Sequence, residues 1–328
     1  MLKDYRTMDS LRTIIQSLLN SAGNLTQPQQ KFLITLFSTL LISCGRANFT
    51  NLGRYSQLNE RTYRRQYQRS FNFMKFNQQL IEQAIKPESP VILAVDCSFI
   101  PKSGKQTYGL DNFYNGSVSR AEKGLEISAM AVVDVNRKIA YNLSVQQTPT
   151  SSSSPKKIEP AETSRIDCYL AQLEATAPFL PLSLRYVVCD GFYSKLKWVN
   201  KVTNLKLEAI GKLRCDANLR YLNQDPYLGR GRPRKYAGKV ELTDDSNFEL
   251  VTSISDTQTL YTAVVWSISL KRQIRICYLL NKGDSSCSYA VLCCTDVKLN
   301  PYFIYLYYKA RFQIEFIFRD SKQFTLTS

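Results

Sequence analysis

Four polar residues near the end of the chain lie on one side of a predicted helix. At about 100° per residue, Tyr308, Arg311, Glu315 and Lys322 fall at about 0°, 300°, 340° and 320°, within an arc of roughly 60°. Most positions between them are apolar, which is typical of a buried helix. A phenol, a guanidinium, a carboxylate and an ammonium on its one polar stripe must therefore face something polar.

Two aspartates complete a set of three carboxylates. Asp96 ends the apolar run 91–96, and Asp190 ends the run 184–190. If these aspartates and Glu315 meet, each pair at about 4 Å costs on the order of 4 kcal/mol at an effective dielectric near 20. Bound cations or uptake of a proton would relieve that repulsion. Magnesium prefers such ligands, and two divalent ions can promote phosphodiester hydrolysis and transfer.

These residues resemble a known pattern. The two aspartates and the glutamate resemble the catalytic triad of DDE transposases, and Y-x2-R-x3-E-x6-K resembles the signature of one large group of bacterial insertion-sequence transposases. The sequence Asp-Gly-Phe-Tyr at 190–193 is a further, moderately specific match. The resemblance implies an RNase H-like catalytic domain that uses two Mg²⁺ ions, with Mn²⁺ as a possible substitute. Asp96 would bridge both ions, and Asp190 and Glu315 would each hold one.

The same resemblance implies roles for the rest of the helix motif and for the whole protein. Arg311 and Lys322 would contact phosphates of the DNA end, and Tyr308 would contact or orient the same backbone. The protein would bind terminal inverted repeats, cleave them through a hairpin intermediate and join them to target DNA. A homodimer would form the synaptic complex, in the bacterial cytoplasm and at the nucleoid when bound to DNA.

Two other acidic residues compete for a place in the site. Asp134 ends an apolar run but precedes Val-Asn-Arg-Lys, a hairpin-turn composition, so we expect a turn residue. Glu126 could be a fourth acidic residue near the metals, but an exposed strand position is the preferred interpretation. Cys97 and Cys189 adjoin the aspartates, and strand alternation should direct them away from the site.

The elements that position the motif predict an α/β protein: an RNase H-like mixed sheet with helices, an all-helical N-terminal domain and a β-rich insertion. Residues 1–86 show helical periods and are expected to bind DNA. Within them, a short helix at 50–55, with Thr50 as its cap, a turn at 56–59 and a basic helix at 60–69 resemble a helix-turn-helix. Its candidate DNA contacts are Arg61, Arg64 and Arg65. An ordinary solvated basic helix is the alternative.

The catalytic core should occupy residues 87–213 and resume at 296–328 with the glutamate helix. Short β-branched runs predict strands at 91–95, 125–134, 138–146, 184–189 and 207–213, with helices at 166–177 and 194–202. Strands mixed with helices in this order suit an α/β domain with a mixed sheet.

A β-rich insertion is expected between them, at 214–295. Its first part contains Arg-Gly-Arg-Pro, which resembles an AT-hook core, and such arginines can lie in a narrow minor groove. The candidate DNA contacts here are Arg230, Arg232, Arg234 and Lys235. A merely solvated loop is the alternative. Trp266 could stack on a flipped base, although a core position is the favoured interpretation.

Composition narrows the function classes. The 328 residues carry a formal charge of +16, which favours a polyanionic partner such as DNA. The absence of histidine excludes Ser-His-Asp chemistry, and the absence of C-x-x-C pairs disfavours structural zinc. Nine cysteines, several in strand-like runs, suggest reduced thiols in a cytosolic protein. The longest apolar run, 32–44, is too short and too polar to span a bilayer, so no membrane association is expected.

The end of the chain raises a second hypothesis. The sequence stops 13 residues after Glu315, at Ser328, whereas the resembling proteins generally continue with further helices. We therefore expect a truncated C-terminus, which leaves the activity of this copy open. A truncated, non-catalytic copy that occupies the element ends as an inhibitor is the alternative to an active transposase. An RNase H-like nuclease of other purpose is a third possibility.

Overall fold

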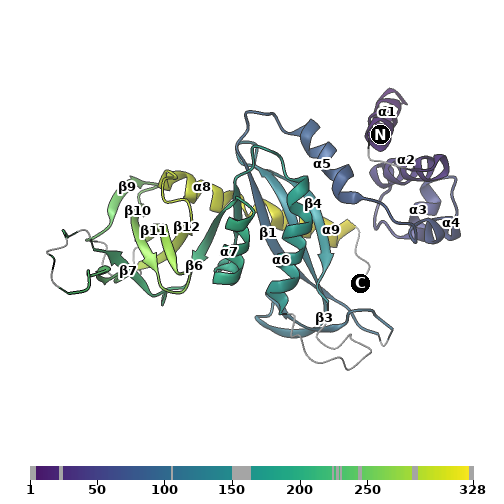
Figure 1. Cartoon of the computed structure of the whole chain (residues 1–328). Coiled ribbons are helices and arrows are strands. Elements are labelled where there is room, and N and C mark those ends of the chain that lie inside the picture. Colours follow the sequence, from purple (N-terminus) through teal and green to yellow (C-terminus); the bar gives the residue numbers. More distant parts are fainter. Residues whose placement is uncertain are drawn as a thin grey trace.

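The computed structural model describes residues 5–21, 25–104, 106–149, 164–223, 225–226, 229, 231–242, 246–282 and 287–324. Figure 1 shows three regions in a row: the N-terminal helices, a central sheet flanked by helices, and a second group of strands at the far end. In this part of the chain, no helix has the length and apolar character needed to cross a membrane.

The N-terminal region consists of helices around a core of its own. They are α1 (Tyr5–Ser21), α2 (Gln27–Ile42), α3 (Phe49–Tyr55), α4 (Glu60–Gln66) and α5 (Phe73–Ala84). Leu19, Leu52 and Tyr63 are fully buried between α1, α2, α3 and α4. A turn at 56–59 joins α3 to α4, as the sequence predicted.

One predicted helix cap was wrong. The cap of α3 is Asn48, whose side chain accepts a hydrogen bond from the Asn51 N–H. Thr50 lies inside the helix and donates instead to the Glu60 carboxylate at 2.8 Å. Both residue types favour caps, so the sequence alone could not rank them, and the partner on α4 uses the threonine hydroxyl.

The central strands form the mixed sheet that the sequence predicted. They are β1 (Val91–Pro101), β2 (Asp111–Asn115), β3 (Arg120–Asp134), β4 (Ile139–Gln147), β5 (Tyr186–Cys189) and β6 (Glu208–Leu213). Strand β1 pairs antiparallel with β3 and parallel with β5, β4 pairs antiparallel with β3, and β6 pairs parallel with β5. In the order β4-β3-β1-β5-β6, β3 runs antiparallel to the other four strands, which is consistent with the RNase H-like fold.

The strands of the far group continue the same sheet. They are β7 (Leu219–Leu222), β8 (Tyr236–Lys239), β9 (Glu249–Ser253), β10 (Gln258–Ser267), β11 (Arg272–Lys282) and β12 (Cys287–Cys294). Strand β12 pairs antiparallel with β6, from Val291–Leu213 to Cys294–Ile210. The strands of the described residues therefore form one sheet in the order β2-β3-β1-β5-β6-β12-β11-β10-β7-β8, with β4 beside β3 and β9 beside β10.

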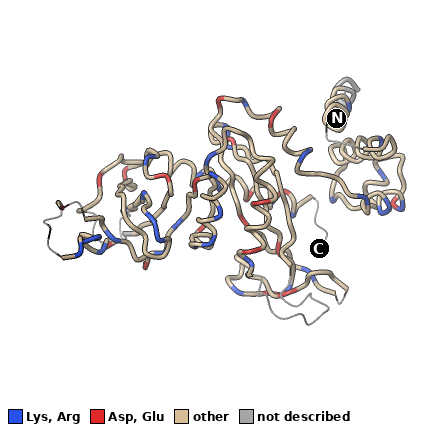
Figure 2. Tube along the Cα trace, viewed as in Figure 1, with Lys and Arg blue, Asp and Glu red and all other residues tan. Residues whose placement is uncertain are grey.

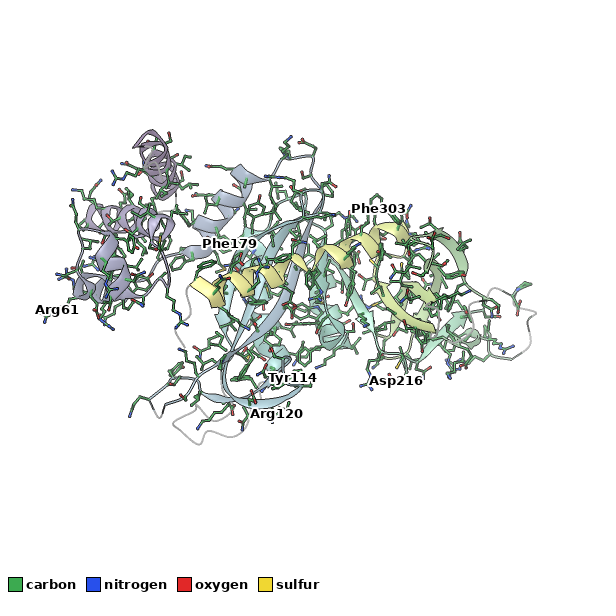
Figure 3. All side chains as sticks on the ribbon, turned by 180° about the vertical axis from the view of Figure 1, so that it is seen from behind. Arg61, Tyr114, Arg120, Phe179, Asp216 and Phe303 are labelled. Atoms are coloured by element: carbon green, nitrogen blue, oxygen red, sulfur yellow. The ribbon has the colours of Figure 1, made fainter. Side chains whose placement is uncertain are left out.

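Helices cover both faces of the central sheet. On one face, α6 (Arg165–Thr176) and α7 (Leu196–Asn204) pack over Leu93, Val95 and Val187. On the other, α8 (Pro301–Ala310) and α9 (Gln313–Phe324) pack over Ile92, Ala94 and Val188. Figure 3 shows α8 and α9 crossing this second face. Short 3₁₀ turns lie at Ala177–Phe179 and Gly191–Tyr193.

The predicted helix that carries the polar motif is in fact two helices. Helix α8 ends at Ala310 and α9 begins at Gln313, so Arg311 lies between them. The junction is a tighter turn, since Phe312 and Glu315 donate their backbone N–H groups to carbonyls three residues earlier. No glycine or proline marks it, which is why the periodic pattern hid it.

The expected burial of this segment all round was also wrong. Ile314 and Phe318 are buried against the sheet, but the side chains of Phe312 and Phe316 are 56% and 37% exposed. The two exposed rings pack edge-on against each other at 5.7 Å. Helix α9 thus buries one side only.

One glycine in the sheet is required by a close approach. Gly124 lies in β3 opposite Pro101 at the end of β1. A Cβ atom there would come within 2.5 Å of the Ile100 carbonyl oxygen and would also overlap the ring of Phe99. Only glycine fits between these groups.

Candidate active site

The two aspartates lie side by side on neighbouring parallel strands. Val95 pairs with Cys189, so the next residues of the two segments are Asp96, within β1, and Asp190, directly after the end of β5. Ala94 and Val188, two residues earlier on each strand, belong to the core beneath α8 and α9, so alternation directs both carboxylates to that face. The predicted strand end was wrong for Asp96, because β1 continues to Pro101 through its pairing with β3.

The Asp96 carboxylate has both oxygens occupied. Its Oδ1 accepts the Cys97 backbone N–H at 2.8 Å, and its Oδ2 accepts Nη1 of Arg311 at 2.6 Å. The side chains of Asp96 and Arg311 are only 15% and 14% exposed, so this is a largely buried ion pair. Arg311 lies at the turn between α8 and α9, and this position brings its guanidinium to the Asp96 carboxylate.

Asp190 is held by the turn that follows it. Its Oδ1 accepts the Phe192 backbone N–H at 2.9 Å, which caps the 3₁₀ turn at Gly191–Tyr193. Burial raises the pKa of Asp190, and the charge of Asp96 raises it further, while Arg311 opposes the shift. The second aspartate is therefore fixed by backbone geometry close to the first.

The charge of Glu315 acts on the Asp96 carboxylate of the same site. Burial raises the pKa of Asp96 to about 6, and the Glu315 carboxylate adds to the rise, although Arg311 and the Cys97 N–H counter it. Glu315 lies in the first turn of α9 and is half-buried. Asp190 and Glu315 thus each lie within range of the charge of Asp96.

The chemistry of these donors fits a hard divalent cation. Carboxylates whose pKa values are raised by burial and by each other gain from a bound cation, and oxygen ligands suit magnesium. Among the described residues, however, no group of three or more Asp, Glu, Cys or His side chains is close enough to coordinate one ion as it stands. In this arrangement the Arg311 guanidinium takes the place of a cation at Asp96.

The other two members of the helix motif lie on either side of this ion pair. Tyr308, in α8, is half-buried, and the Arg311 guanidinium carbon lies 5.6 Å from the centre of its ring. Lys322, in the last turn of α9, is exposed; partial burial of its ammonium lowers its pKa, and Glu315 raises it. All four motif residues therefore lie around the Asp96 carboxylate or the nearby Glu315.

The expected exposure of Glu126 was wrong. Its side chain is buried on the opposite face of the sheet, where Tyr169 of α6 donates a 2.5 Å hydrogen bond to Oε1. Arg165 lies 4.0 Å from Oε2. Glu126 is in phase with Met130 of β3, a buried core residue on that face, and this alternation could have revealed its burial. The thickness of the sheet separates Glu126 from the Asp96 carboxylate.

A contact beneath the site escaped the sequence interpretation. Sγ of Cys97 lies 3.0 Å from Oη of Tyr193, so the residue after Asp96 touches the residue three positions after Asp190. Burial raises the pKa of the Cys97 thiol to about 12. This contact joins the two aspartate-bearing segments from the face opposite their carboxylates. Cys97 and Cys189 do point away from the site, as strand alternation predicted.

Asp134 is the turn residue that the sequence predicted. It is fully buried, and its Oδ1 accepts the Arg137 backbone N–H at 3.0 Å. It is in phase with Met130, so it lies on the face opposite Asp96.

The candidate DNA contacts of the N-terminal region lie along α4. Arg64 pairs with Glu60 at 2.5 Å, and its guanidinium carbon lies 5.3 Å from the ring of Phe49. Arg61 and Arg65 are exposed, and Figure 3 shows Arg61 at the outer edge of the N-terminal helices. None of these three arginines approaches Asp96 in this arrangement, since α4 belongs to a different core.

The basic segment of the far strands lies at the opposite end of the molecule. Figure 2 shows Lys and Arg both near β7 and in the N-terminal helices. Arg230 lies outside the described residues, whereas Arg232, Arg234 and Lys235 are exposed. Nζ of Lys235 lies 3.8 Å from the ring centre of Trp266. Trp266 is only partly buried, so the expected core position was wrong.

Comparison with known proteins identifies the family. A family model described as "DDE superfamily endonuclease" matches residues 40–273, well over half of the chain, and this range contains both strand aspartates but ends before Glu315. A search of curated proteins found no significant match. Because the family match extends through the mixed sheet on which Asp96 and Asp190 lie together, the chain belongs to the DDE superfamily of endonucleases.

Proposed function

We propose that this protein is a DNA transposase, which cleaves the ends of an insertion sequence and transfers them into target DNA. The observation that carries the proposal is the placement of Asp96 and Asp190 as neighbours on one sheet face, with Glu315 close enough to raise the pKa of Asp96. Family membership makes the protein a nuclease of the DDE type that acts on DNA. The step from nuclease to cut-and-paste transposase rests on the complete Y-x2-R-x3-E-x6-K spacing.

The three carboxylates are the proposed metal ligands. Asp96, at the centre, would be shared by two Mg²⁺ ions, and Asp190 and Glu315 would complete the set on either side. When bound, the ions would supply an activated water or 3′-hydroxyl and stabilise the departing oxygen. Mn²⁺ has similar ligand preferences and is expected to substitute.

The chain itself supplies the binding of the DNA end. Arg311 can form two parallel hydrogen bonds to a phosphate, which makes it the natural clamp for the scissile strand. In the arrangement described, its Nη1 donates to Asp96, while its buried Nε has no hydrogen-bond partner among the described residues. Lys322 supplies a second cation and Tyr308 a hydroxyl for the same backbone. The burial of Arg311 and Asp96 limits water at the reacting phosphate.

Two basic surfaces at opposite ends of the molecule would hold the DNA beyond the cleavage point. One is α4, with Arg61, Arg64 and Arg65, and the other is the segment that carries Arg232, Arg234 and Lys235. Both are proposed to contact terminal inverted repeats or target DNA. Lys235 and Trp266 lie together, so that a positive charge for a phosphate stands beside an aromatic ring for a base. A homodimer that brings two element ends together belongs to the same proposal.

The proposal is tested by cleavage of a labelled DNA duplex that carries the end of the insertion sequence encoding this protein. The parent chain is expected to cleave it with magnesium, and Glu315→Gln is expected to bind it without cleaving. Asp134→Asn is the matched control, because it removes a carboxylate from the same sheet on the opposite face and should leave cleavage intact.

Each alternative function gives a different result. Specific binding of the end without cleavage by the parent chain would favour a non-catalytic protein that occupies element ends. Cleavage that does not depend on the terminal sequence would favour a general nuclease. Cleavage by Glu315→Gln at the parental rate would refute the assigned metal site.

A further inference from the structure

A broad groove lies between α1, α2 and the turn from α3 to α4, away from the candidate active site. Its volume is about 870 Å³. Three cations from three separate elements line it: Arg12 of α1, Lys31 of α2 and Arg54 of α3. No Asp or Glu is among the described residues that line it.

The three cations are available to a ligand. Arg12, Lys31 and Arg54 are all exposed. In the described part of the chain, none of them has a carboxylate within ion-pair distance, although ion pairs form elsewhere, as between Arg64 and Glu60 on α4. Because these cations come from distant parts of the sequence, their shared groove is a product of the fold. It creates a positive potential that only an anion can neutralise.

A hydroxyl in the groove provides an independent indication of a ligand. Ser38, on the groove side of α2, is only 5% exposed, and its Oγ has no hydrogen-bond partner among the described residues. Its neighbours Thr35 and Thr39 donate to carbonyl oxygens within α2. A buried hydroxyl without a partner costs about 1–3 kcal/mol, and a phosphate oxygen could accept from it.

The remaining walls of the groove are apolar and aromatic. Ile34, Ile42, Tyr55 and Leu58 line it beside the cations. Ile42 and Tyr55 are each 39% exposed. Such walls suit the apolar edges of deoxyribose between phosphates, which favours a phosphodiester chain over a small anion that carries charge alone.

We propose that this groove binds the DNA backbone through successive phosphates, held by Arg12, Lys31 and Arg54, with Ser38 donating to one phosphate oxygen. The inference deepens the proposed function, since it assumes that DNA is the substrate. It assigns the N-terminal region a second contact surface in addition to α4. The groove grips the backbone whatever its sequence, which leaves base contacts to other residues.

Salt-dependent binding tests the groove. A labelled duplex of unrelated sequence is titrated in EDTA with the parent chain and with the full-length variant Arg12→Ala/Lys31→Ala/Arg54→Ala. Loss of each phosphate contact should weaken binding about 8-fold at 0.1 M salt and reduce the slope of log K against log salt by about 0.9. Three contacts therefore predict a slope smaller by roughly 2.7.

The matched control removes the same charge elsewhere. Lys86→Ala/Lys282→Ala/Lys298→Ala replaces three exposed lysines outside the groove and should change the slope by less than one contact. Lys31→Glu is the second variant: it reverses an exposed charge without removing a large side chain, and should weaken binding at least as much as loss of one contact. Circular dichroism confirms that each variant is folded.

Titration with tripolyphosphate separates DNA from a free phosphate ligand. We expect tripolyphosphate to bind only weakly and to compete poorly with the duplex. Duplex binding by the triple variant with parental affinity and slope would overturn the proposal. Tight tripolyphosphate binding that the triple variant alone loses, with duplex binding unchanged, would assign the groove to a free polyphosphate and also overturn it. Because metal and cleavage are absent from this assay, its outcome does not depend on the transposase proposal.

Discussion

Replacement of Asp96 by asparagine should stabilise the metal-free protein. In the native chain, burial and the Glu315 charge raise the pKa of Asp96 from 3.8 to about 6, even though Arg311 is its partner. The native state therefore binds the Asp96 proton more tightly than the unfolded chain does. It follows that ionisation of this carboxyl costs native stability, and that an asparagine, which cannot ionise, avoids the cost.

The magnitude and the pH range follow from the same two values. Each pKa unit corresponds to about 1.4 kcal/mol, so the difference between 3.8 and about 6 amounts to about 3 kcal/mol. Well below pH 3.8 the carboxyl is protonated in both states and the cost is absent. It grows between pH 4 and pH 6 and is complete above that range. Asp96→Asn should thus gain about 3 kcal/mol at pH 8 and almost nothing at pH 4.

Trp198 provides a suitable probe of unfolding. It is fully buried beneath the sheet, and its ring centre lies 4.8 Å from that of Tyr193, next to the site. A Trp266→Phe background leaves it as the one tryptophan of the chain. Urea denaturation in EDTA, followed by Trp198 fluorescence, then gives the free energy of unfolding of the parent and of Asp96→Asn.

Two controls decide how the result is interpreted. Asp256→Asn changes the net charge equally but at an exposed turn, and should leave stability nearly unchanged. Excess magnesium should stabilise the parent and have little effect on Asp96→Asn, because ligand binding to the native state alone adds to stability. A variant that is less stable than the parent at pH 8, or equally stabilised at pH 4 and pH 8, would refute the reasoning.

Three further substitutions follow from the contacts described. Arg311→Ala leaves the buried Asp96 charge unpaired and should cost about 3 kcal/mol in EDTA at pH 8, and excess magnesium should recover most of that loss in the same urea assay. Tyr169→Phe leaves buried Glu126 without its donor and should cost about 1–3 kcal/mol; an unchanged unfolding midpoint would contradict this. Gly124→Ala should lower the free energy of unfolding by about 1–3 kcal/mol, because the added methyl group overlaps the end of β1. A melting temperature equal to that of the parent would contradict this, since it would mean that β1 moves aside at no cost.

The sequence predicted the elements of the fold well because their signals are local. Apolar runs with β-branched residues marked the central strands, and helical periods marked the N-terminal helices and α6. The mixed sheet followed from this order of elements, whereas the meeting of the two aspartates was expected only from the resemblance to DDE transposases. What the pattern could not show is pairing between distant segments, as in the ladder between β6 and β12 that makes the far strands part of the same sheet.

The errors in the site have a shared physical cause. The break at Arg311 has no local signal, and it accompanies an ion pair with Asp96, a residue far away in the sequence. The burial of Glu126 depends on Tyr169 from a helix beyond the sheet. In both cases, a partner residue distant in the sequence determines the local structure, so the local sequence pattern predicted it wrongly. Such departures from the local pattern are expected for polar residues near a functional site.

The ion pair between Asp96 and Arg311 joins residues that are 215 positions apart. A ribosome that adds 5–20 residues each second needs about 10–40 s to travel that distance. Until α9 has been made, Ile92 and Ala94 lack the cover that Ile314 and Phe318 give them in the finished protein. Once β6 has been made, one face of the central sheet therefore stays bare until α8 and α9 follow, and exposed apolar surface of this kind favours aggregation.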